Sequence, residues 1–370
     1  MLELREILEI ADSCEDAILA TLVDVRGSGY RLAGARMLIA RDGKSIGTVS
    51  GGCLEADILE RAERVRRTDE PTVISYDTTK NEDSVFGLGM GCRGVVRVLL
   101  EPVRNNETLS FIRSCVQGRR SGTISTLISK DDGVEIELAA KYFSDAVSPY
   151  RAGQNSSSLN GLQSSVTRDA LAAIRENRSR CVEYKTASGY AEFFHEVINP
   201  PTSIIIFGAG HDAVPLARLA AQLGWRVAIV DHRPAWTTVD RFPEAEEVLV
   251  GRGDDIPARF FEDSNSVAVV MNHNYDIDRE LLRRLLGSAC RYVGLLGPKS
   301  RTEKLLDELR RQGIKFTEGQ LERLYAPVGL DIGASTPEGI ALSIVAEIQA
   351  VLSGRSGGPL RNRKAPIYDR

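Results

Sequence analysis

The feature that most constrains the fold is a short glycine-rich turn between an apolar strand and a helix. The run Gly208-Ala209-Gly210-His211-Asp212-Ala213 follows the apolar stretch 203–207 and opens a helical pattern over 212–223. The first glycine of such a turn permits a tight bend, the second lets the backbone approach a phosphate, and a small third residue lets helix and strand pack closely. The free N–H groups at the helix start favour an anionic ligand. The turn therefore predicts a parallel sheet with a dinucleotide site at its carboxyl edge.

Alternating apolar strands and amphipathic helices continue beyond this turn to residue 352. The predicted strands are 203–207, 226–231, 247–250, 267–271 and 292–296, and the predicted helices are 212–223, 278–287 and 336–352. This alternation is typical of a Rossmann-like doubly wound parallel sheet. Two consecutive prolines, Pro200 and Pro201, continue neither a helix nor a strand. We therefore predict a Rossmann-like nucleotide-binding domain over 200–370, ending in a basic C-terminal tail.

The same region supplies candidate ligands for NAD(P). Gly208 and Gly210 would admit the pyrophosphate, and His211 would contact it. Asp231, at the end of the second strand, would accept the ribose hydroxyls, and Arg233 leaves the choice between NAD and NADP open. His273 follows a strand at the same edge, where it could act as an acid or base with Asp276 or Asp278, or simply cap a helix.

Residues 1–199 show a less regular order of elements, which predicts an α+β domain. Helices are predicted over 2–17, 53–67, 109–117 and 167–175, and strands over 18–25, 35–40, 44–49, 72–76, 95–100, 123–128, 134–138, 181–185 and 191–198. The polar stretch 151–165 predicts a mobile loop. No internal repeat is recognisable in the sequence. The predicted fold class is thus α/β, with an N-terminal α+β domain followed by a C-terminal Rossmann-like doubly wound sheet.

Charge and hydropathy exclude several classes of partner. The 47 Lys and Arg residues nearly balance the 51 Asp and Glu residues, which argues against a nucleic-acid partner. The longest apolar runs are far below the roughly 20 residues that span a bilayer, so we expect no membrane segment. The N-terminus lacks the basic and apolar regions of a signal peptide, and we therefore expect a cytoplasmic protein.

Two of the six cysteines lie in glycine-rich surroundings, and no CxxC pair is present. Cys53 follows Ser50-Gly51-Gly52 at the predicted start of a helix, where the dipole would favour a thiolate and Glu55 could cap free amides. Cys92 lies within a run with glycines at 87, 89, 91 and 94, whose amides could form an anion-binding nest. Each pattern also fits a structural role. Together they predict a sulfur-lined, anion-binding pocket.

These motifs, taken in order along the chain, resemble those of the xanthine dehydrogenase accessory family, XdhC/CoxI. The matching segments are 28–31, 34–37, 47–55, 76–78, 85–94 and 101–102 in the first domain, and 206–223, 230–233, 272–273, 292–297 and 326–347 in the second. The middle of the first domain, 103–199, carries little of the resemblance.

The resemblance implies an accessory factor that binds molybdenum cofactor (molybdopterin), a chaperone rather than a classical enzyme. Its partners would be a cysteine desulfurase, which supports sulfuration of the cofactor, and the xanthine dehydrogenase-type molybdenum hydroxylase apoenzyme into which the cofactor is inserted. The resemblance also implies a homodimer. Cys53 and Cys92 would contact the molybdenum or carry the transferred sulfur, while the phosphate or pterin would meet Gly51, Gly52, Glu55, Gly89 and Gly91.

Two other functions remain open at this point. An NAD(P)-dependent oxidoreductase would use His273 as its acid–base residue and the cysteines as redox groups. A nucleotide-sensing interaction module would bind NAD(P) in the second domain and dock a client protein through the first.

Overall fold

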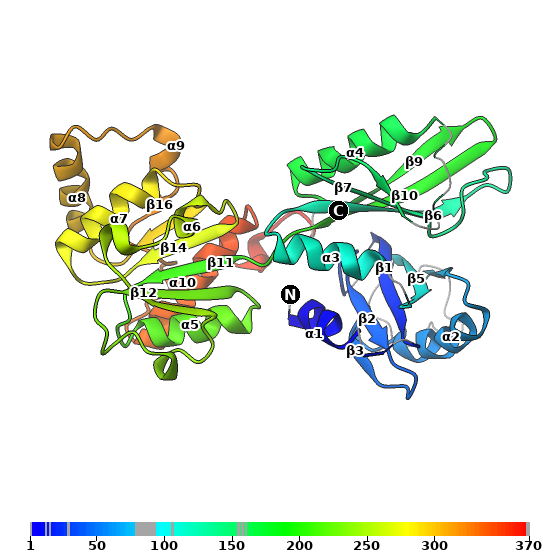
Figure 1. Cartoon of the computed structure of the whole chain (residues 1–370), viewed down its shortest axis with the longest axis horizontal. Coiled ribbons are helices and arrows are strands. Elements are labelled where there is room, and N and C mark those ends of the chain that lie inside the picture. Colours follow the sequence, from blue (N-terminus) through cyan, green and yellow to red (C-terminus); the bar gives the residue numbers. More distant parts are fainter. Residues whose placement is uncertain are drawn as a thin grey trace. The chain divides into compact units, whose positions relative to one another are not determined.

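The computed structural model describes residues 2–11, 13–14, 16–27, 30–77, 94–104, 107–153, 156, 159 and 161–367. The chain divides into two compact units, Leu2–Pro200 and Pro201–Arg370, whose helices and strands are labelled in Figure 1. No helix within these described ranges is long and apolar enough to cross a membrane.

The second unit is built on a six-stranded parallel sheet with the strand order β13-β12-β11-β14-β15-β16. Its strands are β11 (Ser203–Phe207), β12 (Arg226–Asp231), β13 (Glu247–Val250), β14 (Ser266–Val270), β15 (Tyr292–Leu295) and β16 (Leu324–Tyr325). Numbered within the unit, the order is 3-2-1-4-5-6, which is that of the dinucleotide-binding Rossmann sheet. The predicted fold class is confirmed.

Helices cover both faces of this sheet because alternate residues of each strand point to opposite sides. The helices are α5 (Ala213–Gln222), α6 (Arg259–Glu262), α7 (Tyr275–Leu286), α8 (Lys299–Arg311), α9 (Glu318–Leu321) and α10 (Pro337–Leu352), with 3-10 turns η1 (Val239–Arg241), η2 (Gly253–Asp255) and η3 (Leu360–Asn362). Ile204 and Ile206 pack with α5 and α10, whereas Ile205 and Phe207 pack with α7 and α8. Helix α8, together with the short α6, α9 and β16, was not predicted from the sequence.

The first unit contains two five-stranded antiparallel sheets, β3-β2-β1-β5-β4 and β8-β7-β6-β10-β9. The first sheet and its helices comprise α1 (Leu2–Ala11), β1 (Ile18–Gly27), β2 (Arg36–Ile39), β3 (Ser45–Gly47), α2 (Glu55–Thr68), β4 (Thr72–Asp77) and β5 (Gly94–Pro102). The second comprises α3 (Glu107–Gln117), β6 (Gly122–Lys130), β7 (Lys141–Asp145), β8 (Arg151–Ala152), α4 (Gln163–Glu176), β9 (Arg180–Thr186) and β10 (Gly189–Ile198). The order of elements is the same in both halves, which is a structural repeat that is not recognisable in the sequence.

Some predicted elements of the first unit are wrong in detail. The helix expected over 2–17 ends at Ala11, where the backbone and hydroxyl of Ser13 both donate to the carbonyl of Ile10. The strand expected over 134–138 is a series of turns, although Val134 and Ile136 are buried. Their apolar alternation reflects burial beneath a turn, and the neighbouring strand is β7 instead. Of the loop expected over 151–165, residues 154–155, 157–158 and 160 lie outside the described residues, while 151–152 form β8.

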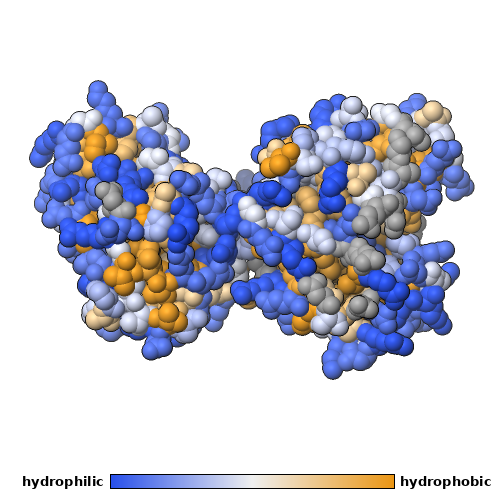
Figure 2. Space-filling view, viewed as in Figure 1, coloured by the Kyte–Doolittle hydropathy of each residue, from blue (hydrophilic) through white to orange (hydrophobic). Residues whose placement is uncertain are grey.

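Large apolar side chains are exposed on both units, among them Tyr30, Tyr190, Ile332 and Leu342. Apolar patches are visible between the hydrophilic residues that dominate the face shown in Figure 2. Exposed apolar patches are common at surfaces that bind other molecules.

Candidate functional site

The loop that carries Cys53 is held in place by the carboxylate of Glu55. This carboxylate accepts hydrogen bonds from the Thr48 hydroxyl (2.6 Å), from the backbone N–H groups of Ser50 (2.9 Å) and Leu54 (3.2 Å), and from the Ser50 hydroxyl. The Ser50 hydroxyl oxygen in turn accepts from the N–H groups of Gly52 and Leu54. The loop between β3 and α2 is therefore fixed by its own polar groups, and Cys53 is presented on it as an exposed side chain.

Electrostatics keep Glu55 ionised. Burial alone would raise the pKa of Glu55, but the hydrogen bonds from Ser50 and Thr48 outweigh it, and the pKa lies below its usual value. Helix α2 begins at Glu55 with Leu54 as its N-cap, so the helix start expected at Cys53 is too early by two residues. The difference arises because the glycines 51 and 52 extend the turn. The helix dipole that we expected to act on the thiol thus acts on a carboxylate in the first turn.

Glycine is required at two points around this loop. Gly47 has φ +79°, and a Cβ there would lie 2.4 Å from the carbonyl oxygen of Arg36. Gly52 has φ +105° and open space where a side chain would be. A Cβ at Gly51 would lie 3.5 Å from the ring of Tyr30, so an exposed aromatic ring lies beside the loop. The predicted site residues Cys92, Gly89 and Gly91 lie outside the described residues.

The remaining cysteines are less accessible. Cys115 and Cys290 are buried, and Cys14 and Cys181 are half-buried. Burial raises the pKa of Cys115 to about 11 and that of Cys181 to about 12, and it also raises the pKa of Cys290. These three thiols stay protonated at neutral pH, which makes them poor nucleophiles and poor metal ligands.

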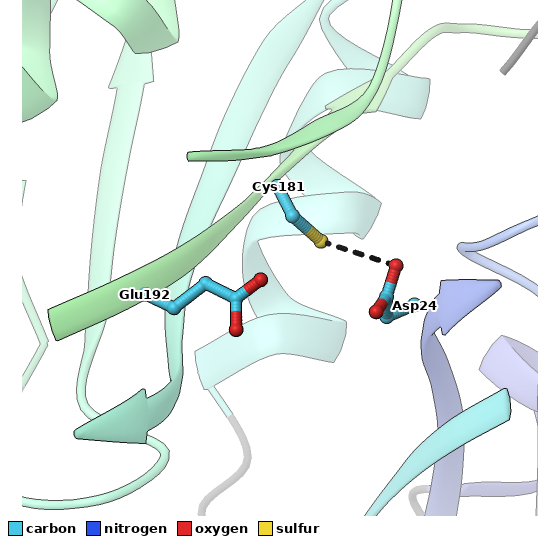
Figure 3. A group of neighbouring side chains, drawn as sticks. All are labelled: Asp24, Cys181 and Glu192. Carbon is cyan, nitrogen blue, oxygen red and sulfur yellow. Dashed lines mark hydrogen bonds between the residues drawn. The ribbon is translucent and has the colours of Figure 1, made fainter. Parts of the chain in front are cut away.

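Cys181 belongs to a group of three side chains whose ligand atoms lie within 4.8 Å of one another, with Asp24 and Glu192 as the other members (Figure 3). Arg97 lies between the two carboxylates, 2.7 Å from Asp24 and 2.6 Å from Glu192. Arg26 contacts both carboxylates as well. Because two guanidinium groups balance two carboxylates, the arrangement is a partly buried ion-pair network, and its charges leave little attraction for a cation.

In the second unit, the glycine turn lies at the carboxyl edge of β11, beside the end of β14. Gly208 has φ +123°, and a Cβ there would lie 2.6 Å from the carbonyl oxygen of Met271. A Cβ at Gly210 would lie 2.6 Å from the carboxylate of Asp212. Gly208 is thus required by a backbone contact within the protein itself, whereas the flexible Asp212 side chain could move away from a side chain at position 210. The turn lies at the switch point where ligands of such sheets bind.

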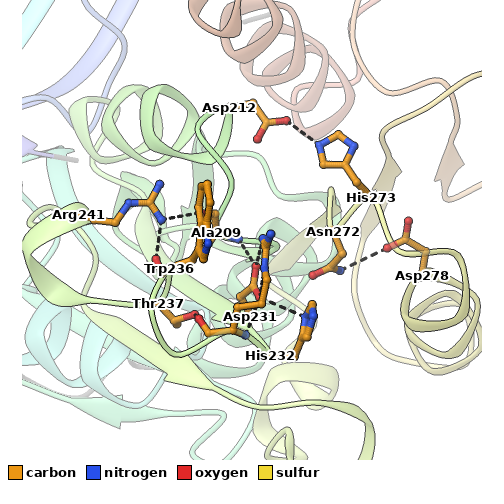
Figure 4. A network of polar contacts seen from close by, with 11 residues as sticks. Ala209, Asp212, Asp231, His232, Trp236, Thr237, Arg241, Asn272, His273 and Asp278 are labelled. Atoms are coloured by element: carbon orange, nitrogen blue, oxygen red, sulfur yellow. Dashed lines mark hydrogen bonds and ion pairs between the residues drawn. The ribbon is translucent and has the colours of Figure 1, made fainter.

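Asp231 is enclosed by hydrogen-bond donors (Figure 4). Its carboxylate accepts from the backbone N–H of Ala209 (2.7 Å), from the backbone N–H of Arg233 (2.9 Å) and from the Arg233 guanidinium (2.7 and 3.0 Å). The side chain is 0% exposed. Burial would raise its pKa, but the bonds from Arg233 and Ala209 lower it below the usual value. A ribose hydroxyl could bind this carboxylate only after displacing Arg233.

Two side chains that were not singled out from the sequence, Trp236 and Arg241, lie close to Arg233. The Arg233 guanidinium lies over the ring of Trp236, 5.0 Å from its centroid, and the Arg241 guanidinium lies 4.7 Å from the same centroid. The ring of His211 meets Trp236 edge-on at 5.1 Å. Arg233 and Trp236 closely follow Asp231 along the chain, and this proximity in sequence is the signal that could have revealed the cluster.

His273 lies at the expected edge of the sheet, but its partner differs from the prediction. Its Nε2 lies 3.3 Å from the Asp212 carboxylate, and neither Asp276 nor Asp278 is its hydrogen-bond partner. Asp278 is fully buried and is engaged by Arg301 (2.8 Å) and Asn272 (3.3 Å). His273 is exposed and has φ +57°, an uncommon conformation for a non-glycine residue that is found at functional sites.

Comparison with known proteins shows which family the chain resembles. A family model described as "XdhC and CoxI family" matches residues 11–77, which include the Cys53 loop, and one described as "XdhC Rossmann domain" matches residues 204–348. A Bacillus subtilis protein named as a probable xanthine dehydrogenase subunit is 33% identical over 336 residues, covering 90% of this chain and 92% of that protein. The chain belongs to the XdhC and CoxI family.

Other relatives of this XdhC-family chain agree. A crystal structure titled as a xanthine dehydrogenase from Bacillus halodurans superimposes with a TM-score of 0.75 at 31% identity, covering 96% of each chain. The Escherichia coli molybdenum cofactor insertion chaperone PaoD is 23% identical, covering 94% of this chain and 87% of that protein. The resemblance inferred from the sequence motifs is confirmed.

Proposed function

We propose that the chain binds molybdenum cofactor as its cargo, supports sulfuration of that cofactor with a cysteine desulfurase, and inserts it into a molybdenum hydroxylase of the xanthine dehydrogenase type. The observation that carries the proposal is an exposed thiol, Cys53, on a loop that Glu55 fixes in one conformation. The thiolate is the form of cysteine that binds metals, and access to solvent lets a large cofactor reach it.

The surroundings of Cys53 suit a flat, anionic cofactor. Gly51 and Gly52 carry no side chain, and the space beside Gly52 is open. Tyr30 exposes an aromatic ring next to Gly51, and aromatic rings stack on planar heterocycles such as a pterin. Cys92, with Gly89 and Gly91, belongs to the proposal on its sequence pattern alone.

The named relatives support the choice of cargo and client. One relative is named a molybdenum cofactor insertion chaperone, and two others are named for xanthine dehydrogenase. The proposed partners are therefore a molybdenum hydroxylase apoenzyme and a cysteine desulfurase, with a second copy of the chain as a further proposed partner.

A transfer experiment tests the proposal. The purified chain is loaded with molybdenum cofactor in the presence of a cysteine desulfurase and mixed with an apo molybdenum hydroxylase, whose activity is then measured. The wild-type chain should activate the hydroxylase, and Cys53→Ala should activate it far less. Cys14→Ala is the matched control because Cys14 is half-buried elsewhere in the unit. Equal activation by wild type and Cys53→Ala would contradict the assigned role of Cys53.

A second candidate function is nucleotide binding by the Rossmann unit, with Gly208, Gly210 and His211 at the pyrophosphate. We propose that Arg233, rather than Asp231, contacts the ribose of such a nucleotide. The Asp231 carboxylate is enclosed, whereas the Arg233 guanidinium is 36% exposed beside Trp236. A guanidinium favours a 2′-phosphate, which points to NADP over NAD.

Fluorescence titration with NADPH and NADH tests this second candidate. NADPH should bind more tightly than NADH, and Arg233→Ala should abolish the difference. Arg218→Ala removes an exposed arginine from the neighbouring helix α5 and serves as the control. Equal or tighter binding of NADH by the wild-type chain would contradict a role for Arg233 in reading a 2′-phosphate.

A further inference from the structure

The two halves of the first unit are built to one plan. Each runs helix, three strands, helix, two strands, and each sheet places its first strand at the centre between its second and its fifth. The elements α1 to β5 form the first copy, and the elements α3 to β10 form the second copy. Figure 1 shows the two sheets with their helices.

Local details coincide as well. In each copy the central strand carries one bulge, because the register with its neighbour skips Val23 in β1 and Ile128 in β6. One residue before each bulge, Leu22 and Leu127 each exchange two backbone hydrogen bonds with the turn that precedes the next strand. That turn holds a residue with positive φ in both copies, Gly34 and Ala139.

The second helices of the two copies also match. Helices α2 and α4 are 14 residues long, begin after a leucine N-cap and end on a left-handed residue, Asp69 or Asn177. Their buried positions have the same spacing, with Ile58, Ala62 and Val65 in α2 and Val166, Ala170 and Ala173 in α4. Agreement in topology, bulge, turn and cap is the pattern that is expected when one segment of helices and strands has been duplicated.

The copies contact each other through reciprocal ion pairs. Arg36 of β2 forms a bidentate pair with Glu196 of β10 (2.7 and 2.6 Å), and Lys141 of β7 pairs with Glu101 of β5. Arg36 and Lys141 occupy equivalent positions, because each directly follows the matching turn of its copy. Glu101 and Glu196 are also equivalent: they pair with Leu19 and Ile124, which lie three residues before the matching leucines Leu22 and Leu127. Each copy thus gives a cation and a carboxylate to the other, as two protomers do across a two-fold axis.

A third pair joins equivalent positions directly. Arg97 pairs with Asp24 of β1, and Glu192 pairs with Ser129 of β6. Asp24 and Ser129 each lie two residues after the matching leucine of their central strand, so Arg97 and Glu192 occupy equivalent positions. These equivalent residues bind each other at 2.6 Å. A contact between equivalent positions occurs at the axis of a two-fold arrangement.

The copies differ where the sequence motifs placed the chemistry. In the first copy the connection from β3 to α2 holds Cys53, and Glu55 begins the helix. In the second the connection from β8 to α4 holds no cysteine, and Gln163 begins the helix. The connection between the last two strands spans 78–93 in the first copy and only 187–188 in the second. Shared features maintain the fold, so features present in one copy alone serve another purpose.

We infer that the first unit is a fused pseudo-dimer in which the second copy has become a structural partner and Glu55 positions the Cys53 loop for the cargo in the first copy only. This inference rests on the proposed function for the identity of the cargo. Gln163 marks the difference because an amide offers one acceptor oxygen where the Glu55 carboxylate accepts four hydrogen bonds. Glu55 is a positioning residue, since it acts through the loop.

The test exchanges the two side chains. Glu55→Gln gives the first copy the residue of the second, and Gln163→Glu does the reverse as a matched control. Backbone hydrogen exchange, the melting temperature and the affinity for free molybdopterin are measured for both variants. Glu55→Gln should speed exchange over 48–54 and weaken molybdopterin binding by about tenfold or more, because hydrogen bonds to a charged group are lost. Gln163→Glu should change neither.

The outcomes separate this inference from the proposed function. Equal effects of the two variants on molybdopterin binding, or an unchanged loop and affinity in Glu55→Gln, would overturn the assignment of the chemistry to the first copy. A fall in melting temperature without a fall in affinity would reduce Glu55 to a structural role and overturn it as well. If the wild-type chain binds no molybdopterin, the proposed function fails, and faster exchange over 48–54 in Glu55→Gln alone would still support the asymmetry of the two copies.

Discussion

Burial decides which titratable side chains of this chain can react at neutral pH. The thiols of Cys115 and Cys181 are held protonated by burial, whereas Cys53 is exposed on a fixed loop. The same rule applies to the histidines, because His195 is fully buried between Ser125 and Tyr184 while His273 is exposed. Exposure thus sets Cys53 and His273 apart from the buried thiols and from His195.

Buried His195 predicts that the protein loses stability in mild acid. Burial lowers the pKa of His195 from 6.5 to about 4, so between these values only the unfolded chain takes up the proton. The stabilisation is complete above pH 6.5 and is lost as the pH falls towards 4, by up to about 3 kcal/mol. Urea unfolding at several pH values measures this loss. His195→Gln, which does not titrate, should show a flatter pH dependence; the same slope in both proteins would refute the prediction.

Gly208 predicts a steep cost for one added methyl group. A Cβ there would lie 2.6 Å from the Met271 carbonyl oxygen, and the residue has φ +123°. Gly208→Ala should lower the free energy of unfolding by about 3 kcal/mol or more. Gly43→Ala, at φ +81° with no atom within 4 Å of the added carbon, should cost only about 1 kcal/mol. Equal losses in chemical denaturation would show that the close approach at β14 is unimportant.

At the scale of elements, sequence patterns predicted those whose burial is regular. The strands 203–207 and 226–231 have the predicted bounds, because buried parallel strands read as short apolar runs between turns. The predicted strand 134–138 is wrong because Val134 and Ile136 are buried without pairing. The helix start at Cys53 is also wrong, since the glycines 51 and 52 extend the turn and α2 begins at Glu55.

The contact between the two sheets of the first unit predicts a large effect for one arginine. Arg36 and Glu196 are 5% and 8% exposed in their side chains. Arg36→Met should lower the free energy of unfolding by about 3–5 kcal/mol, because it leaves a buried carboxylate without its partner. Adding Glu196→Met should recover most of that loss. Arg5→Met, which breaks the exposed pair with Glu9, should cost about 1 kcal/mol or less. A loss in Arg36→Met no greater than that in Arg5→Met would contradict the role of this pair.

At the scale of the whole molecule, the two units differ in how far the sequence reveals them. The Rossmann unit could be predicted because its strands and helices alternate along the chain, which is a local pattern, and because the glycine turn marks the end of its first strand. The α+β class of the first unit could be predicted as well, but its strand order could not, because its central strand pairs residues 18–27 with residues 94–102 and nothing in a local pattern records that pairing. The duplication was not recognised in the sequence, because the two copies share bulges, caps and ion pairs more closely than they share residue types.

The candidate sites, too, could be predicted only in part from the sequence. Cys53 and Glu55 were recognisable from their glycine frame, but the bonds that fix the loop depend on Thr48 and Ser50, which no sequence motif singled out as ligands of Glu55. Trp236 and Arg241 were missed because their stacking around Arg233 is a tertiary feature. A sequence pattern does not show which side chains from separate turns lie close together in the fold.

The central claim is that the chain holds molybdenum cofactor through Cys53. The most direct measurement is the amount of molybdopterin and molybdenum that remains bound to the purified chain after gel filtration, compared between wild type, Cys53→Ala and Cys14→Ala. We expect wild type and Cys14→Ala to retain the cofactor and Cys53→Ala to lose most of it while keeping its melting temperature. Equal retention by all three proteins, or none by any of them, would contradict the claim.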